Sequence, residues 1–469
     1  MPQEEKDRRF LELFKKITYL QFLTDFSSMD YCYPPTFIFK RFPYKNFFKK
    51  NSADIRRGKY GLYIHFPYCA YKCIFCRQFS SAITEKALYH EYVDLIEKEI
   101  GLYAPYFRRS FLTNVYFGGG TPTLFNLEKV LKAIYNNFKI DKDFQLNIEA
   151  TPDSLDRSNL VTLKKMGLTR LLIGIQSFDP RVLEAINRPT NQLAVFKKVY
   201  HLAQKANIAA VNVELIAGLP RQSMVSFIQD LKYIINLKPA SIHIYMFLKT
   251  PLTVLGRKEP KFEKGDRALR DKMYDIGARI LADNNYFFRG DDFSLSDKER
   301  NPQLSAAGLV KNFKGIIGLG LSAYGYIPFE NLDIATLNTF DLQEYKEKLK
   351  AGYLPIKKYY KLGQEERLRK FLIRRYRYDN INAELLRKIF RAKGLTFREL
   401  VYRFKKEFSF LERMGKLKIN LEHETLVFNK EGLDGFIYSK AFYSSKVLKE
   451  CQQIIDSRYQ DIRVNLDFL

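Results

Sequence analysis

Three closely spaced cysteines carry the strongest chemical signal in this sequence. Cys69, Cys73 and Cys76 are separated by three and then two residues, whereas Cys32 and Cys451 stand alone. Thiolates are soft ligands that suit iron-sulfur clusters. Four cysteines would saturate a cubane cluster, so three leave one iron open for another ligand. Disulfide pairing explains such a clustered, odd-numbered set poorly, and the two outliers are expected to be buried thiols.

Zinc is the main alternative occupant of this triplet. A structural zinc site has four ligands, and His65, four residues before Cys69, is the candidate for the missing one. The residue types alone leave both the cluster and the zinc site open.

A glycine-rich segment, Gly-Gly-Gly-Thr-Pro at 118–122, follows an apolar run. Glycine lets the backbone approach a ligand closely, which suits the ammonium or carboxylate of an amino acid. A tight strand-to-helix turn is the structural alternative.

Glu149 ends another apolar run, and a carboxylate there can accept two ribose hydroxyls, although a single acid is more often a surface residue. Gln176 and Arg188 carry weak signals when taken singly.

Short apolar runs alternate with segments of helical periodicity between residues 61 and 325. The expected strands are 62–66, 114–117, 146–149, 170–175, 210–216, 241–246 and 315–320. The expected helices lie near 88–100, 127–138, 194–204 and 224–237. This alternation indicates parallel strands joined by right-handed crossovers, with reactive groups at the carboxyl ends of the strands. The cysteines, the glycine segment, Glu149 and Gln176 all lie at or just after such ends.

Three segments are expected along the chain. Residues 1–58 begin with a helix and continue as an extended N-terminal arm, and residues 59–329 carry the alternating pattern. Residues 330–469 are mainly helical and rich in Lys and Arg, with a hairpin at 416–420 and 424–428. Helices with a hairpin are compatible with a winged-helix-like, nucleic-acid-binding module. A helical cap over the barrel mouth is the favoured interpretation, and no nucleic acid partner is expected.

Composition limits the class of protein. Hydrophobic residues make up 46% of the 469 residues and charged residues 28%, which is typical of neither a disordered nor a membrane chain. No apolar run reaches the roughly 18 residues of a spanning helix, and the first ten residues are too charged for a signal peptide. We therefore expect no membrane span and a cytoplasmic location. The net charge of +26 suggests an acidic partner or substrate, or only solvated basic faces.

These motifs together resemble the oxygen-independent coproporphyrinogen dehydrogenase family of radical S-adenosyl-L-methionine (SAM) enzymes. The resemblance covers residues 60–330 and preserves both order and spacing. It is carried by Tyr-Ile-His-Phe-Pro-Tyr-Cys at 63–69, the cysteine triplet, the segment 118–123, Ile-Gly-Ile-Gln-Ser-Phe at 173–178, Arg188, and Leu-Ile-Ala-Gly-Leu-Pro at 215–220.

The resemblance implies an α/β fold, a partial (β/α)6 TIM-like radical SAM barrel. It implies a [4Fe-4S] cluster on Cys69, Cys73 and Cys76, with SAM on the fourth iron, and the cofactor supplies a 5′-deoxyadenosyl radical that abstracts hydrogen from the substrate. The residues implied for the first SAM are Tyr63, Gly119, Gly120, Glu149 and the segment 322–324 with Tyr324. The residues that correspond to contacts of a second SAM in the family are Phe75, Thr121, Gln176, Arg188 and Glu214. His65 matches a family histidine implicated in function and is the candidate catalytic residue.

Departures from the family pattern concern the substrate. The porphyrinogen enzymes usually have a fourth cysteine where this chain has Gln78, an Asp where it has Glu214, and a His where it has Asp291-Asp292-Phe293. Methyltransferases and cyclopropanating enzymes of the branch use a second SAM as methyl source and commonly lack the fourth cysteine. Haem chaperones of the branch carry a Trp-containing segment, and this chain has no Trp.

The leading hypothesis is oxidative decarboxylation of propionates on coproporphyrinogen III or a related tetrapyrrole. The segments 290–295 and 309–313 resemble the porphyrinogen enzymes, and a basic surface suits a substrate with several carboxylates. Radical C-methylation or cyclopropanation with a second SAM is the alternative, followed by a haem chaperone-like or nucleic-acid-binding role. The expected partners are a small anionic substrate and an electron donor such as flavodoxin or ferredoxin.

Overall fold

The computed structural model describes most of the chain. The described residues are 2–24, 33–43, 47–188, 190, 192–250, 252–258, 264–288, 293–295, 315–375, 381–390, 396–428 and 435–458. Asp291, Asp292 and the segment 309–313, which bear on the substrate, lie outside them. No helix in the described ranges is both long and apolar enough to span a bilayer.

Two compact units make up the structure. One unit consists of Lys40–Lys361, and the other combines Met1–Phe39 with Leu362–Asp467. The boundary expected from the sequence at 329/330 falls between two hydrogen-bonded antiparallel strands, β13 (Tyr324–Pro328) and β14 (Asp333–Asn338). Backbone pairing therefore carries the larger unit beyond that position. The expected boundary at 58/59 likewise lies inside the larger unit, because β1 (Lys40–Arg41) pairs with β15 (Ile356–Leu362).

The larger unit is built on a sheet of 13 strands in the order β1-β15-β14-β13-β12-β2-β5-β6-β7-β8-β9-β11-β10. Each neighbouring pair from β12 to β9 is parallel, and the other pairs described within this sheet are antiparallel. The parallel strands are β2 (Lys59–Phe66), β5 (Phe111–Gly119), β6 (Lys139–Ala150), β7 (Leu168–Gln176), β8 (Ala210–Ala217), β9 (Ser241–Met246) and β12 (Gly315–Leu319). The seven strands expected from the sequence are confirmed.

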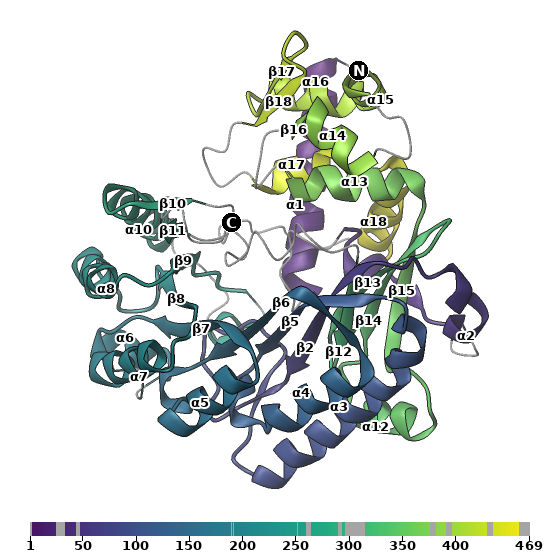
Figure 1. Cartoon of the computed structure of the whole chain (residues 1–469). Coiled ribbons are helices and arrows are strands. Elements are labelled where there is room, and N and C mark those ends of the chain that lie inside the picture. The colour runs from purple at the N-terminus through teal and green to yellow at the C-terminus, as the bar shows by residue number, and fades with distance from the viewer. Residues whose placement is uncertain are drawn as a thin grey trace. The chain divides into compact units, whose positions relative to one another are not determined.

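Helices connect these strands and cover the outer face of the sheet (Figure 1). They are α3 (Lys86–Phe107), α4 (Leu127–Asn137), α5 (Arg157–Lys165), α6 (Pro180–Ala185), α7 (Leu193–Lys205) and α8 (Met224–Leu237), followed by α9 (Val254–Lys258) and α10 (Lys264–Asp283). Strand-helix alternation around a curved sheet is the expected partial (β/α)6 barrel, and the structure confirms it. The remaining elements of this unit are α2 (Phe47–Asn51), β3 (Tyr68–Cys69), β4 (Ser81–Ala82), β10 (Tyr286–Phe288), β11 (Phe293–Leu295) and α12 (Leu342–Lys350).

Local sequence explains where the barrel helices begin. Asn126, Asp156, Asp179 and Ser223 each accept a backbone N–H of the following helix, which satisfies donors that the helix itself leaves unpaired. The helices then bury one apolar face against the strands. On α4 that face is Leu127, with Val130, Leu131 and Ile134.

The smaller unit combines helices with a short sheet. Its elements are α1 (Gln3–Thr24), α13 (Gln364–Arg375), α14 (Ala383–Phe390), α15 (Phe397–Arg403), α16 (Lys405–Arg413), α17 (Gly435–Ala441), α18 (Ser445–Arg458), β16 (Ile381–Asn382), β17 (Leu417–Asn420) and β18 (Thr425–Phe428). The hairpin expected at 416–428 is confirmed as β17 and β18. Arg413 on α16 pairs with Asp7 on α1 at 2.8 Å, so the two ends of the chain form one unit.

A buried carboxylate in the larger unit secures the loop that follows β12. Glu99 on α3 accepts hydrogen bonds from the Gly320 backbone N–H at 2.8 Å and from the Asn338 amide at 2.9 Å. The Tyr345 hydroxyl on α12 also donates to it. Burial raises the pKa of Glu99 to about 7, although the three donors oppose the shift.

Tyr92, also on α3, joins this loop to the end of β2. Its hydroxyl donates to the His65 carbonyl at 2.9 Å and accepts the Leu321 N–H at 2.8 Å. A Cβ at Gly320 would lie 2.5 Å from the same His65 carbonyl, so the close approach requires glycine. The loop at 320–322 is therefore held against the strand that leads to the cysteines.

Glu99 predicts a pH dependence of stability. Its folded pKa of about 7 exceeds the ordinary value of 4.5, so the folded state binds more protons between these values. The stabilisation is complete below pH 4.5 and is lost as pH rises through 7, a change of about 3 kcal/mol. Glu99→Gln cannot ionise, so its unfolding free energy should fall by less than that of the wild type between pH 4.5 and 8. Chemical denaturation of both proteins across this pH range measures these free energies. The prediction is contradicted if the unfolding free energy of the two proteins changes with pH in parallel.

Candidate functional site

The cysteines lie on a loop that begins at the carboxyl end of β2. The loop is closed by pairing of β3 with β4, including the Ile83 N–H to the Cys69 carbonyl at 2.9 Å. The Cys76 N–H donates to the Cys73 carbonyl at 3.2 Å, which places these two residues in one turn. All three cysteines are free thiols, and each lies near enough to influence the charge of another.

Burial makes two of these thiols, Cys69 and Cys73, reluctant to ionise. It raises the pKa of Cys69 to about 11, and the neighbouring Cys76 and Cys73 thiols contribute to the same direction. Burial also raises the pKa of Cys73, against the opposing effect of Arg188. A thiol must lose its proton to bind iron. The thiolate forms of Cys69 and Cys73 are therefore favoured only when a positively charged group or a metal ion lies beside them.

Two cations accompany the cysteine loop. Arg188 donates from Nε to Cys73 Sγ at 3.1 Å and from Nη1 to the Gly174 carbonyl at 2.5 Å. Its guanidinium lies 5.9 Å from the centre of the Phe75 ring. Lys72 Nζ donates to the Ser80 carbonyl at 2.8 Å and the Ser80 hydroxyl at 2.7 Å. The hydrogen bond from Arg188 to Cys73 stabilises a thiolate, and those from Lys72 to Ser80 hold the two ends of the loop together.

Neither nitrogen of His65 is left for a metal. Its Nδ1 lies 2.9 Å from the Tyr63 hydroxyl and its Nε2 lies 2.7 Å from the Phe79 carbonyl. Since a carbonyl only accepts, Nε2 carries the proton and Nδ1 accepts from Tyr63. Burial lowers the pKa of His65 to about 4, so the ring stays neutral. The zinc interpretation thereby loses the fourth ligand proposed for it.

The glycine segment lies directly beside the cysteine loop. A Cβ at Gly120 would be 2.5 Å from the Tyr68 carbonyl and 3.0 Å from Cys69 Sγ. Gly119 has φ +108°, and a Cβ there would be 2.7 Å from the His65 ring. The Thr121 N–H donates to the Tyr68 carbonyl at 2.9 Å. Only glycine fits these close approaches, so the segment is both a tight turn and one wall of the loop.

Two carboxylates lie on the inner face of the barrel. Glu149 accepts the Tyr116 hydroxyl at 2.6 Å and the Gly119 N–H at 3.1 Å. Burial raises its pKa. Burial also raises the pKa of Glu214 to about 7, with Glu149 contributing, while Arg188 and Arg170 act in the opposite direction. The positive charge of the two arginines is thus set against two buried acids.

Gln176 and Tyr324 complete the set expected from the sequence. Gln176 ends β7 in the left-handed region at φ +67°, and its buried Oε1 has no hydrogen-bond partner among the described residues. Ser177 and Phe178 next to it are fixed by Asp230 at 2.6 Å and 3.0 Å. Tyr324 begins β13 at the end of the loop that Glu99 secures. An unpaired acceptor on a strained residue in the barrel is suited to contact a ligand.

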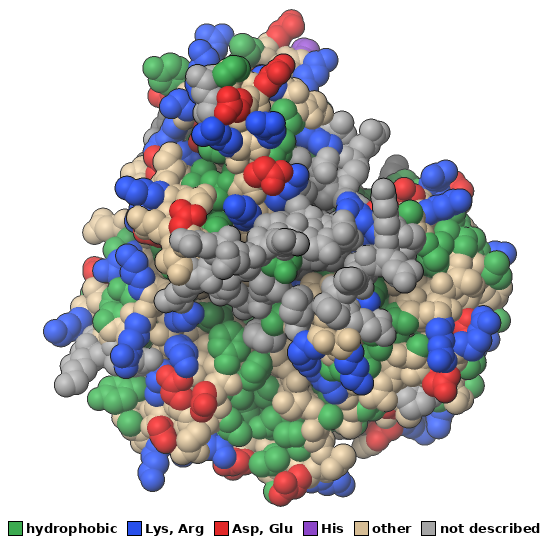
Figure 2. Space-filling view, turned by 180° about the vertical axis from the view of Figure 1, so that it is seen from behind, with side chains coloured by type: hydrophobic (Ala, Val, Ile, Leu, Met, Phe, Trp, Pro, Cys, Tyr) green, Lys and Arg blue, Asp and Glu red, His purple; other side chains and the backbone are tan. Residues whose placement is uncertain are grey.

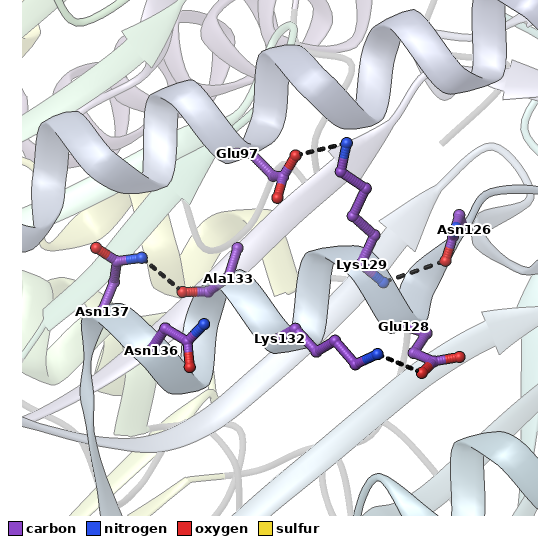
Figure 3. A pocket seen from close by; sticks show the side chains of 8 residues that line it. All are labelled: Glu97, Asn126, Glu128, Lys129, Lys132, Ala133, Asn136 and Asn137. Carbon is purple, nitrogen blue, oxygen red and sulfur yellow. Dashed lines mark hydrogen bonds and ion pairs between the residues drawn. The ribbon is translucent and has the colours of Figure 1, made fainter.

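The pocket drawn in Figure 3 lies elsewhere, on the outer surface between α3 and α4. Its charged side chains pair with one another: Lys129 contacts Glu97 at 2.9 Å, and Lys132 contacts Glu128 at 2.7 Å. It contains none of the residues expected from the sequence. The candidate site is therefore the inner face of the barrel.

Comparison with known families agrees with this geometry. A model of the radical SAM superfamily matches residues 63–234, which include the cysteine loop, the glycine segment, Glu149, Gln176 and Arg188. This chain contains a region that matches the radical SAM superfamily. The matched region ends within α8. Similarity beyond that helix is therefore judged from relatives that align with a longer part of the chain.

The relatives are similar to this protein along most of its chain. An oxygen-independent coproporphyrinogen III oxidase of Helicobacter pylori is 28% identical over 401 residues, 80% of this chain and 81% of the relative. One of Synechocystis is 27% identical over 338 residues, covering 69% and 72%. The heme chaperone HemW of Buchnera aphidicola is 28% identical over 306 residues, covering 64% and 78%. The resemblance to the coproporphyrinogen family is thus confirmed.

A solved structure supports the fold. Coproporphyrinogen III oxidase of Escherichia coli superposes with a TM-score of 0.74 at 21% identity, covering 87% of this chain and 95% of the other. Such low identity shows the fold alone. It agrees with the expected partial barrel extended by further elements.

The cofactors are a [4Fe-4S] cluster and SAM, and the residues present fit them. Three free thiols share one loop, and Arg188 is placed to offset the charge of Cys73 when it ionises. The side-chain-free surface of Gly120 lies against Cys69, and the Gln176 acceptor is unpaired among the described residues. No cluster of His, Cys, Asp or Glu in the described ranges is close enough to hold a single metal ion.

Sequence reasoning missed several residues of the site. Tyr116 lies on the same strand as Gly118, two positions earlier, so strand alternation alone would have placed it beside Glu149. Lys72 and Glu99 gave no local signal. Their partners lie 8 and 221 or more residues away in the sequence.

The close packing around Gly120 predicts that one added methyl group disrupts the cysteine loop. Gly120→Ala should abolish stable cluster binding, because its Cβ would overlap the Tyr68 carbonyl and reach Cys69. Gly101→Ala on α3 is the matched control, since nothing lies within 4 Å of its Cβ and alanine favours a helix. Iron and sulfide per chain after anaerobic reconstitution measure the effect, and circular dichroism checks folding. Full cluster content in Gly120→Ala would contradict this fit.

The contacts of Lys72 predict slower iron loss in the wild type than in Lys72→Met. Removing the charged donor removes two hydrogen bonds that hold Ser80, which should speed iron release to a chelator roughly tenfold. Lys232→Met, an exposed lysine on α8, is the control. Equal release rates in Lys72→Met and Lys232→Met would show that Lys72 does not secure the loop.

Proposed function

We propose that this chain removes carboxylates from propionate side chains of coproporphyrinogen III or a related tetrapyrrole, leaving vinyl groups. The observation that carries the proposal is the similarity to oxygen-independent coproporphyrinogen III oxidases along four fifths of both chains. Each propionate loses CO2, one proton and two electrons. One electron leaves with a hydrogen atom, and the other requires a one-electron acceptor.

The proposal assigns roles to the site residues. Cys69, Cys73 and Cys76 hold the cluster, which when bound supplies the electron that cleaves SAM to a 5′-deoxyadenosyl radical. Tyr63, Gly119, Gly120, Glu149 and Tyr324 contact that SAM. Phe75, Thr121, Gln176, Arg188 and Glu214 line the space where a second SAM would lie.

Positioning is the main task of the protein's own groups. Tyr116 and the Gly119 N–H fix the Glu149 carboxylate, so its remaining lone pairs are oriented before a ribose arrives. His65 holds the Tyr63 hydroxyl on one side and the cysteine loop through Phe79 on the other. Because the His65 ring is neutral and both of its nitrogens are hydrogen-bonded, it suits a positioning role better than proton transfer to substrate.

Charge supports an anionic substrate. The net charge is +26, and Figure 2 shows Lys and Arg side chains spread over the visible face without a single dense patch. A dispersed positive field attracts a tetra-anion by long-range steering, and ionic strength should weaken that attraction. An electron donor such as flavodoxin or ferredoxin is the proposed source of the electron.

Anaerobic turnover tests the proposed reaction. Reconstituted enzyme with SAM, a reductant and coproporphyrinogen III should release CO2 and form vinyl-bearing products, with 5′-deoxyadenosine formed alongside. Cys76→Ala is the matched control and should give neither product. SAM cleavage by the wild type without CO2 or vinyl product would overturn the substrate assignment.

Radical C-methylation is the second candidate. The position of the family's fourth cysteine holds Gln78, which is exposed, and methyltransferases of the branch commonly lack that cysteine. This reaction would transfer the labelled methyl of SAM to product and form S-adenosylhomocysteine. Absence of either product removes this candidate.

A further inference from the structure

Strand β7 ends in a tight turn centred on Gln176. The Ser177 N–H donates to the Ile175 carbonyl at 2.8 Å, which closes a turn of three residues around Gln176, whose φ is +67°. A three-residue turn with a positive central φ is rare and strained when the central residue is not glycine. Such a conformation persists only where the surrounding structure holds it in place. Groups that contact the segment after the turn therefore determine where Gln176 lies.

Asp230 on α8, a helix that covers the outer face of the sheet, supplies two of these contacts. Its Oδ2 accepts the Ser177 hydroxyl at 2.6 Å, and its Oδ1 accepts the Phe178 N–H at 3.0 Å. Asp230 is 2% exposed and Ser177 is fully buried, so both groups lie away from solvent. A carboxylate has two acceptor oxygens, and here each of them receives one donor. Replacing Asp230 by alanine would leave two buried donors without this partner, which is unfavourable.

Further contacts fix the direction of these hydrogen bonds. The Asp179 N–H donates to the Ser177 hydroxyl oxygen at 3.2 Å, so this oxygen accepts one bond while its hydrogen is directed at Asp230. The Phe178 ring packs against the Phe196 ring of α7 at 5.4 Å between centres. The segment that follows the turn is therefore held by the outer helices, and Asp230 is its hydrogen-bonding anchor.

The turn places the Gln176 amide on the inner face of the barrel. A Cβ added to Gly174 would lie 2.9 Å from Gln176 Nε2. The same Cβ would lie 3.4 Å from Glu214 Oε2 and 3.7 Å from Arg188 Nη1. The amide, the carboxylate and the guanidinium therefore converge over Gly174. A rotation of the backbone at Gln176 would move its amide out of this arrangement.

We propose that Asp230 is a positioning residue that holds Gln176 in its left-handed conformation and thereby keeps the Gln176 amide directed at a bound ligand. Asp230 acts through the backbone of the turn, because α8 lies on the opposite side of the sheet from the ligand space. The inference rests on the proposed role of Gln176 as a ligand contact. It gives a helix on the outer face of the sheet a part in setting the affinity of the inner site.

Substitutions can separate positioning from stability alone. Asp230→Ala removes both acceptors, whereas Asp230→Asn keeps an amide oxygen for the Phe178 N–H and loses the acceptor of the Ser177 hydroxyl. Thr169→Val is the matched control at the other end of the same strand. The Thr169 hydroxyl accepts the Leu146 N–H at 2.9 Å and donates to the Leu146 carbonyl at 2.8 Å. Asp230→Ala and Thr169→Val each remove two hydrogen bonds of β7, so both should lower the melting temperature.

The test is a double-mutant cycle on cluster-loaded full-length enzyme under anaerobic conditions. Equilibrium binding of SAM, with its stoichiometry, and of coproporphyrinogen III is measured for Asp230→Ala, Gln176→Ala and the double variant. Each single change should weaken binding of the same ligand about tenfold, and the double variant should also be only about tenfold weaker, because the second change removes a contact already lost. Asp230→Asn should weaken binding about threefold and Thr169→Val less than twofold.

Cluster absorbance and thermal melting confirm that each variant is folded, and Asp230→Asn takes the place of Asp230→Ala in the cycle if the alanine variant does not fold. A double variant about a hundredfold weaker would show independent effects and overturn the proposal. Unchanged binding in Gln176→Ala, or binding by Asp230→Ala that equals that of Thr169→Val, would overturn it too. If the wild type binds SAM but releases no CO2 from coproporphyrinogen III, the proposed function fails, whereas the SAM cycle still decides the role of Asp230.

Discussion

The burial of the Cys69 and Cys73 thiols on one short loop is the constraint on which this structure depends. Burial raises the pKa of Cys69 to about 11 and that of Cys73 as well, so these two thiols ionise readily only with compensating charge. Arg188 meets part of that need directly at Cys73 Sγ. In the proposed function an iron-sulfur cluster meets the rest, because metal binding removes the thiol protons.

Parallel strands explain why the remaining site residues meet this loop. The carboxyl ends of β2, β5, β6 and β7 lie at the same edge of the sheet, and hydrogen bonds cross between them. Glu149 on β6 accepts the Gly119 N–H from β5, and the Gly120 N–H of the adjoining turn reaches the Phe66 carbonyl of β2. The candidate site is consequently built from chain segments far apart in the sequence, on a rigid support.

The sequence predicted what depends on local pattern. The seven parallel strands and the helices α3, α4, α7 and α8 were predictable because periodicity is local, and the cysteine triplet because its spacing is compact. The extension of the sheet through β13 and β14 was not, since antiparallel strands added after a barrel leave no distinct signal. Nor were the contacts of Glu99, whose partners Gly320, Asn338 and Tyr345 become neighbours only after folding. The contact of His65 Nε2 with the Phe79 carbonyl was not predictable for the same reason.

The central claim is that three cysteines hold a cubane cluster whose fourth iron binds SAM. Electron paramagnetic resonance of the reduced, anaerobically reconstituted protein, recorded with and without SAM, tests it most directly. The account predicts a [4Fe-4S]+ signal whose g values shift when SAM is added, and loss of that signal in Cys69→Ala. A protein that takes up no iron and sulfide, or a signal that SAM leaves unchanged, would contradict it.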